Sequence, residues 1–162
     1  MITISNNLNA TLSLFLSSGL LLGAFFLEFY LSLIPCDLCN KQRIVHASIL
    51  ILSLLIFPLY TFSKLKFIML SILNLLWLGS FSLAFYHFGI EKKMWQGFSK
   101  CSSNITFNEN TLDQLLSRSP IRCDETQLEL LNLSLAGWNG ILSIIIFIIL
   151  SYLLYRNYKE TK

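Results

Sequence analysis

Charged residues are scarce in this sequence. They make up 13% of its 162 residues, whereas apolar residues make up 54%. That composition is not typical of a soluble globular domain. The sequence also has no internal repeat, no low-complexity tract and no glycine loop of the phosphate-binding kind. Its first ten residues contain no Lys or Arg, so we do not expect the first apolar run to be a removable signal peptide.

The apolar residues fall into four runs, at about 12–33, 44–62, 67–88 and 138–155. Each is close to the roughly 20 residues that a helix needs to cross a bilayer. A soluble domain of this size cannot bury four helices that are apolar on all sides. We therefore predict an all-α membrane protein, a single domain whose four transmembrane helices form a bundle.

Basic residues distinguish the two ends of this bundle. The short link at 61–66 carries Lys64 and Lys66 without an acid, and the C-terminal tail is also mainly basic. The loops at about 34–43 and 89–137 balance their cations with acids. Cytoplasmic loops are enriched in Lys and Arg, most clearly when they are short. We therefore expect both termini in the cytoplasm and the two balanced loops in the periplasm, where disulfides persist.

The loop at 89–137 has two candidate helices. Thr111 and Gln114 have capping-box spacing, which predicts a short helix through Leu116 that ends before Pro120. Leucines alternate with acids over 124–136, which predicts a second short amphipathic helix along the membrane surface.

The most informative motif is the pair Cys36 and Cys39, followed by Arg43. If the second helix begins near Cys39, its thiolate lies at a helix N-terminus, one turn from a permanent cation. Both features stabilise negative charge on sulfur, so the pKa of Cys39 should fall below the ~8.5 of a free thiol. Such a cysteine is a good leaving group in disulfide exchange.

Cys101 and Cys123 are the other two cysteines, 22 positions apart. Four cysteines allow three pairings, and the residues alone do not choose among them. A disulfide in this loop would contribute about 3 kcal/mol by the chain-entropy model and could be purely structural. A tetrahedral zinc site is disfavoured by the single Cys-x-x-Cys and the oxidising compartment. Haem attachment needs a His directly after Cys39, where Asn40 stands.

Four ionisable residues lie within or beside the apolar runs. Glu28 either faces the bundle interior with a partner or lies at the membrane rim, and the sequence leaves both options open. Arg43 either anchors the helix at the interface or, with His46 and His87, binds the carbonyl oxygen of a lipid-soluble quinone. Either histidine alone would more often be structural.

Several motifs together resemble the bacterial disulfide bond formation protein B (DsbB) family over nearly the whole chain. They stand in family order on a four-span frame, which makes the resemblance specific. They are Pro-Cys-x-Leu-Cys with its arginine at 35–43, Tyr-His-x-Gly-x-Glu at 86–91, Trp-x-Gly at 95–97, Cys-Asp-Glu at 123–125 and Ser-Leu-Ala-Gly-Trp-Asn at 134–139.

The resemblance implies a quinone-dependent thiol oxidase of the inner membrane. Such a protein oxidises a periplasmic thioredoxin-like partner of the DsbA type and passes the electrons to ubiquinone or menaquinone. By match to the family, Cys101–Cys123 is the disulfide that the partner attacks, with Cys101 forming the mixed disulfide. Cys36–Cys39 then reoxidises that pair.

The resemblance also assigns the quinone site. Cys39 would face the quinone ring, Arg43 would be the quinone-binding cation and His87 a nearby polar partner. Gln42 is a departure, since some relatives carry an acid before the arginine, and the short separation of Cys101 and Cys123 leaves the partner's identity open. Two alternatives are an enzyme of the vitamin K epoxide reductase type and a structural tetraspan protein whose disulfides staple its loops.

Overall fold

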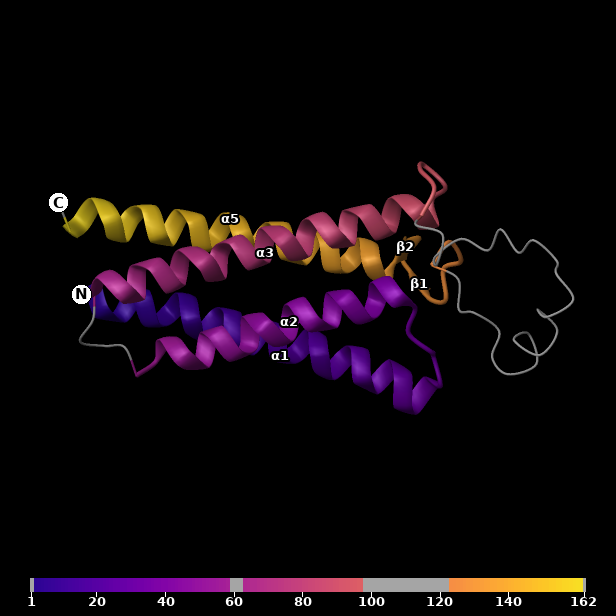
Figure 1. Cartoon of the computed structure of the whole chain (residues 1–162), viewed down its shortest axis with the longest axis horizontal. Helices are drawn as coiled ribbons and strands as arrows, with labels where there is room; N and C mark the ends of the chain where they lie inside the picture. Colours follow the sequence, from indigo (N-terminus) through magenta and orange to yellow (C-terminus); the bar gives the residue numbers. More distant parts are fainter. Residues whose placement is uncertain (1, 59–62, 98–122, 162) are drawn as a thin grey trace, which may run out of the picture.

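The computed structural model describes residues 2–58, 63–97 and 123–161. This part of the chain forms four long helices that lie lengthwise beside one another, with a small hairpin at one end (Figure 1). Both termini lie at the opposite end. The elements in chain order are α1 (Ile2–Leu31), α2 (Asp37–Ile56), α3 (Ser63–Glu91), β1 (Glu129–Leu130), β2 (Leu133–Ser134) and α5 (Leu135–Thr161).

Three of these helices are long and apolar enough to cross a membrane, over Asn7–Leu31, Lys64–Glu91 and Leu135–Lys159. The fourth, α2, has 20 residues and begins with a polar turn. The structure is therefore that of a mainly helical membrane protein. The predicted runs 67–88 and 138–155 lie inside α3 and α5, and the run 12–33 extends just past the end of α1.

The second helix begins before the apolar run at 44–62, as expected for a helix that starts near Cys39, and it ends within that run. The helix begins at Asp37, because the Cys36 sulfur accepts a hydrogen bond from the backbone nitrogen of Cys39 at 3.2 Å and so caps the first turn. It ends at Ile56, two residues before Pro58; Phe57 still has helical φ and ψ of −59° and −46°, and Pro58 has no N–H with which to continue the helix.

The inner half of the bundle, toward the termini, holds a continuous apolar core. The indole of Trp77 is fully buried there and donates from Nε1 to Ser13 Oγ at 3.1 Å. Every helix contributes apolar side chains to this core, because the apolar runs have no polar face that must stay in water. Its buried members are Ala10, Ile49, Ile56, Leu70, Leu73, Trp77, Ile146 and Leu150.

The prediction of an amphipathic helix over 124–136 is wrong. The chain forms a two-stranded antiparallel hairpin instead, in which Glu129 pairs with Ser134 and Leu130 with Leu133. Its two turn residues, 131 and 132, have φ values of 55° and 63°. Two successive left-handed residues are incompatible with a helix and match the tight turn of a hairpin. The helix predicted at 111–116 lies outside the described residues.

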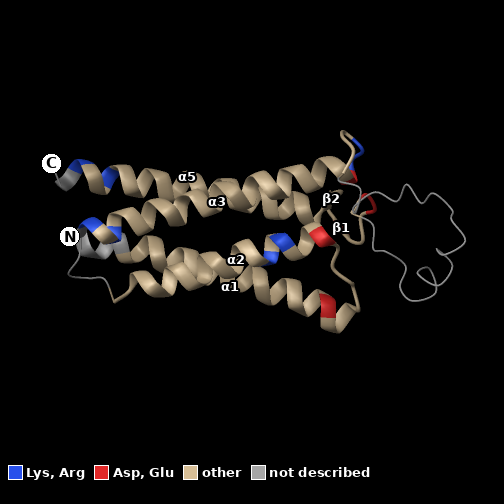
Figure 2. Cartoon of the chain, in the orientation of Figure 1, with Lys and Arg blue, Asp and Glu red and all other residues tan. Residues whose placement is uncertain are grey.

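The charges are distributed along the bundle as the sequence suggested. In the part of the chain that Figure 2 colours, Lys and Arg mark the end that holds both termini, whereas acids and cations occur together toward the hairpin end. Lys66 is buried near the terminal end and donates to Asn7 Oδ1 at 2.6 Å.

Candidate active site

Cys36 and Cys39 lie at the outer end of α2, before the predicted span at 44–62. Cys36 is the N-cap and Cys39 lies in the first helical turn. Their sulfurs are 2.9 Å apart as two thiols, with Cys36 donating to Cys39. Cys36 is buried and Cys39 partly exposed. The local geometry therefore brings the two sulfurs together while leaving only Cys39 accessible.

The hydrogen bond between the two sulfurs separates their acidities. It raises the pKa of Cys36 far above its ordinary value, aided by burial, because Cys36 must keep the shared proton. The same bond is the main reason that the pKa of Cys39 is lowered, while burial opposes the shift. Arg43 lowers it further by a smaller Coulombic effect. The direction expected from the sequence is confirmed, but the main cause is the neighbouring thiol rather than the cation.

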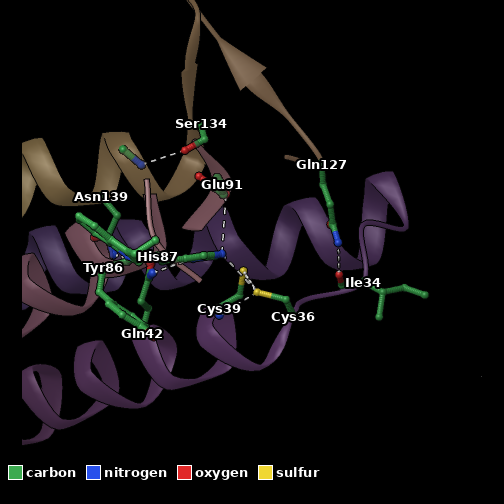
Figure 3. Close-up of polar contacts among 12 residues, drawn as sticks. Ile34, Cys36, Cys39, Gln42, Tyr86, His87, Glu91, Gln127, Ser134 and Asn139 are labelled. Carbon is green, nitrogen blue, oxygen red and sulfur yellow. Dashed lines mark hydrogen bonds and ion pairs between the residues drawn. The ribbon is translucent and has the colours of Figure 1, made fainter. Parts of the chain in front are cut away.

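His87 lies on the far side of the cysteine pair, at the outer end of α3. Its Nε2 is 3.5 Å from Cys36 Sγ and 3.7 Å from a carboxylate oxygen of Glu91. The side chain is buried, and it also meets the backbone oxygen of Cys123. Figure 3 shows the ring between the cysteines and Gln42. The structure thus places His87 against the sulfur of Cys36.

A run of amide side chains continues from His87 into the bundle. Gln42 Nε2 is 3.1 Å from His87 Nδ1, and Gln42 Oε1 accepts from Asn139 Nδ2 at 2.8 Å. Asn139 Oδ1 is 2.9 Å from His46 Nε2, which is also 3.3 Å from Ser80 Oγ. Three helices, α2, α3 and α5, therefore share one buried polar network at the site.

Arg43 is held by α1. Its guanidinium forms an ion pair with Glu28 and donates from Nη2 to the backbone oxygen of Ala24 at 2.9 Å. It also lies 5.1 Å from the centre of the Phe25 ring, a distance at which a cation is attracted to the ring face. Of the two options that the sequence left open for Glu28, the structure shows the paired one.

Cys123 is brought to the same place from the segment that precedes the hairpin. It is buried and belongs to an apolar cluster with Cys36, Leu38 and Ile90. The structure therefore joins one cysteine of the outer loop to the Cys-x-x-Cys motif. Cys101 lies outside the described residues, so its predicted pairing with Cys123 stays a prediction.

The motifs at 86–91 and 95–97 meet above the end of α3. Trp95 donates from Nε1 to the backbone oxygen of Tyr86 at 2.9 Å, and the two rings stack 6.2 Å apart. A Cβ atom at Gly89 would overlap the Trp95 ring. Only glycine fits beneath this indole. The glycine of the motif at 86–91 therefore allows the indole to pack over the cysteine cluster.

A cavity of about 280 Å³ opens between α1, α2 and α5 beside the cysteines. Glycine, alanine and leucine residues form much of its wall, and the segments at 33–36 and 125–128 close its outer rim. A mainly apolar cavity with a few converging polar groups is typical of a small-molecule site. Its polar side includes Cys39, Arg43, His46, His87 and Asn139.

The same corner has the donor atoms for a metal ion. Among the described residues, Cys36, Cys39 and His87 place one ligand atom each within 4.8 Å of one another. Two thiols and an imidazole suit a soft or borderline ion. Thiols that also form a disulfide can bind an ion only when reduced.

Gln42 and Asn139 are the site residues whose role the sequence reasoning did not recognise. Gln42 entered only as a neutral residue where some relatives have an acid, and Asn139 only as part of a motif. The available signal was their position, since polar side chains within an apolar helix usually face the bundle interior.

The comparison with protein families gives one match. The family model described as disulfide bond formation protein DsbB matches residues 6–153. A comparison with curated proteins finds no significant match.

Proposed function

Since the chain belongs to the DsbB family, a family of membrane proteins for disulfide bond formation, we propose that it is a quinone-dependent protein-disulfide oxidoreductase. It reoxidises a periplasmic thioredoxin-like dithiol oxidase of the DsbA type. The electrons pass through Cys101–Cys123 and Cys36–Cys39 to ubiquinone or menaquinone.

This function requires a particular placement in the inner membrane. We take the apolar part of α2, which begins at about residue 44, as the fourth span of one integral domain, with both termini in the cytoplasm and the cysteines on the periplasmic side. Support comes from the basic residues at the terminal end of the bundle, whereas acids balance the cations at the other end (Figure 2). The hairpin and the cysteine cluster would then lie at the periplasmic surface, where a soluble partner can reach them.

Disulfide exchange accounts for the flow between the two cysteine pairs. The partner's thiolate attacks Cys101 and breaks the Cys101–Cys123 bond, which releases Cys123 as a thiolate. Cys123 attacks Cys36, with which it shares a buried cluster, and the Cys36–Cys39 bond breaks with Cys39 as leaving group. Arg43 favours this direction, because it lowers the pKa of Cys39 and a thiol of lower pKa leaves faster. Attack of the partner's second thiolate on its mixed disulfide with Cys101 releases the oxidised partner and a Cys101 thiolate. Cys101 then attacks Cys123 and releases Cys36, which restores Cys101–Cys123 and leaves Cys36 and Cys39 as two thiols.

The cavity fits a quinone ring. It is mainly apolar, adjoins Cys39, and presents the hydrogen-bond donors of Arg43 to its interior. Arg43 is oriented by Glu28 and Ala24, so its remaining N–H groups are pre-positioned. When bound, a quinone supplies an acceptor for two electrons and two protons. Cys39, Arg43 and His87 are the residues that would hold it there.

One observation carries this proposal, the opening of the reactive Cys39 into an apolar cavity beside a fixed cation. A protein whose disulfides only stapled its loops would not need a cysteine of lowered pKa next to such a cavity. In that alternative the cysteine pairs would resist reduction.

The test is quinone reduction by the purified full-length protein with a reduced thioredoxin-like partner. Ubiquinone and menaquinone are compared at equal concentration, and the absorbance of the quinone is followed. We expect reduction of at least one quinone, with one disulfide formed in the partner for each quinone reduced. A lack of quinone reduction, together with resistance of the cysteines to dithiothreitol, would support the structural alternative.

A further inference from the structure

The chain has two histidines, and two amide side chains connect them through the bundle. Gln42 bridges His87 and Asn139, and Asn139 bridges Gln42 and His46, over three contacts of 3.1, 2.8 and 2.9 Å. All four side chains are buried or partly buried. An amide has one donor end and one acceptor end, so the orientation of each member of this series determines that of the next.

The contact between Cys36 and His87 decides which atom donates each hydrogen bond along this series. Cys36 uses its thiol hydrogen toward Cys39, so its sulfur can only accept a hydrogen bond from His87 Nε2. Nε2 therefore carries the hydrogen of the neutral ring and Nδ1 accepts from Gln42 Nε2. Figure 3 shows these contacts on the two sides of the His87 ring.

The same reasoning determines which nitrogen of the second histidine carries its hydrogen. The oxygen of Gln42 accepts from the amide nitrogen of Asn139, which leaves the oxygen of Asn139 to face His46. An oxygen can only accept, so His46 Nε2 must carry the ring hydrogen. Ser80 lies at the same nitrogen. His46 Nδ1 is consequently a bare acceptor.

That acceptor has no hydrogen-bond partner among the described residues, although it is buried. His46 itself lines the cavity beside Cys39. A buried acceptor without a donor is unfavourable. Nδ1 has less than 1 Å² of accessible surface, so a molecule in the cavity that carries a hydroxyl group would supply the missing hydrogen once the ring turns toward it. A carbonyl oxygen would not, because it is itself an acceptor.

We propose that His46 Nδ1 is a hydroxyl-binding subsite of the cavity, and that Gln42 and Asn139 are the positioning residues that keep it an acceptor. The subsite favours a dihydroxy aromatic ring, the hydroquinone form, over the dicarbonyl form. The choice of ligand rests on the proposed function, whereas the hydrogen-bond direction rests on the protein alone. The two histidines then have opposite roles: His87 donates a hydrogen bond to the sulfur of Cys36, and His46 accepts one from a molecule in the cavity.

The first test needs no quinone. Nitrogen-15 NMR of the full-length protein labelled at histidine gives a pair of ring signals, from Nδ1 and Nε2, for each of the two histidines. We expect both neutral rings in the Nε2–H form. Asn139→Leu should release His46 into a mixture of tautomers while His87 keeps its form. A parent protein with His46 in the Nδ1–H form would overturn the proposal.

Gln42→Glu extends this test without removing a side chain. The carboxylate still accepts from Asn139 Nδ2, so the His46 signal should stay. It can no longer donate to His87, so the His87 signal should shift toward the Nδ1–H or doubly protonated form. Ser48→Ala, on the exposed face of α2, is the matched control and should move neither signal. A shift of His46 equal to that of His87 would contradict the relay.

The second test measures binding of a short-chain ubiquinone and of its hydroquinone. Both are titrated to protein in which Cys36 and Cys39 are replaced by Ser, so that no reaction occurs. We expect His46→Phe to weaken hydroquinone binding roughly three- to tenfold, as for one neutral hydrogen bond, and quinone binding less than twofold. Equal losses for both forms would mean that water satisfies His46, and would overturn the subsite. Failure of the proposed function appears separately, as absent quinone reduction in the parent.

Discussion

The inner and outer halves of this bundle differ in what their buried polar groups surround. In the inner half, hydroxyls bond within an apolar core, such as Ser53 to the backbone of Ile49 at 2.7 Å and Ser13, which accepts from Trp77. The outer half buries thiols, imidazoles and amides around a cavity of about 280 Å³. The first half is filled, and the second is left partly open.

This difference indicates how the chain divides its two tasks. Close packing in the inner half fixes the helices relative to one another, since interiors lose stability for each methylene that is removed. The outer half can then hold a cavity, because the packing of the inner half fixes its geometry. Substitutions in the two halves should therefore have separable effects on stability and on chemistry.

The largest effect on chemistry is expected from Cys39→Ser. A hydroxyl cannot form a disulfide, so partner oxidation should fall by about three orders of magnitude or more, as for loss of a nucleophile. The thermal midpoint in detergent should change little, because the substitution replaces one small side chain near the rim. Partner oxidation is measured by thiol alkylation and gel shift. Unchanged oxidation in this variant would refute the proposed function.

The opposite result is expected from Leu73→Ala in the inner half. Leu73 is fully buried in the core cluster, and such a truncation typically costs about 2–5 kcal/mol of unfolding free energy. The measurement is unfolding in mixed micelles. Quinone reduction per folded molecule should stay near that of the parent. A loss of turnover in the folded fraction would show that the two halves are coupled.

The sequence was sufficient to predict the parts of the structure that depend on composition and on strong motifs. Four apolar runs predicted four helices, and the basic link and tail predicted the uneven charge of the two ends. The family was identified from short motifs, with their order on the four-span frame as the decisive feature. Each of these features is encoded locally, in one run or one motif.

The missed features depend on contacts between segments distant in the sequence. The ion pair of Glu28 with Arg43 joins two helices, and the contact of Gln42 with Asn139 joins residues 97 positions apart. The hairpin was missed because leucines alternating with acids suit a strand and a helix over so short a stretch. Its turn is set by positive φ at Leu131 and Asn132, and leucine rarely adopts that conformation.

Arg43→Ala should have the next largest effect on chemistry. Loss of the guanidinium removes the donors that face the cavity and leaves Glu28 without its partner. We expect the KM for quinone to rise roughly tenfold or more, in line with loss of charge-assisted hydrogen bonds, and the thermal midpoint to fall less than in Leu73→Ala. Arg43→Lys should recover part of the loss, because a lysine keeps the charge but not the fork of donors. A parental KM in Arg43→Ala would remove Arg43 from the quinone site.

The unequal acidity of the two cysteines can be measured by alkylation of the reduced protein across pH. The thiolate is the reactive form, and the pKa of Cys39 is lowered from 9.0. Its rate should therefore level off below pH 9 and fall about tenfold per unit at lower pH. The rate at Cys36 should still be rising above pH 9, because the pKa of that thiol is raised. Equal profiles for the two sulfurs, read by mass spectrometry, would contradict the shared proton.

The smallest effect is expected from a single methyl group in the cavity, and it bears directly on whether the outer half is open. Gly23 on α1 lines the cavity, and a Cβ there would meet no atom within 4 Å. Gly23→Ala should therefore raise stability by about 0.5–1 kcal/mol, since alanine loses less backbone entropy than glycine in a helix. The KM for quinone should change less than twofold.

Gly23→Leu should behave differently, because its side chain would reach into the space that a quinone ring needs. The expected result is a KM several-fold higher with unchanged stability, an effect of steric exclusion rather than of unfolding. Gly79 provides the matched control, since it is also helical with nothing within 4 Å of its Cβ position but does not line the cavity. Gly79→Leu should leave the KM unaltered. If both leucine variants raised the KM equally, the cavity beside Cys39 would not be where the quinone binds, and the open outer half would need another explanation.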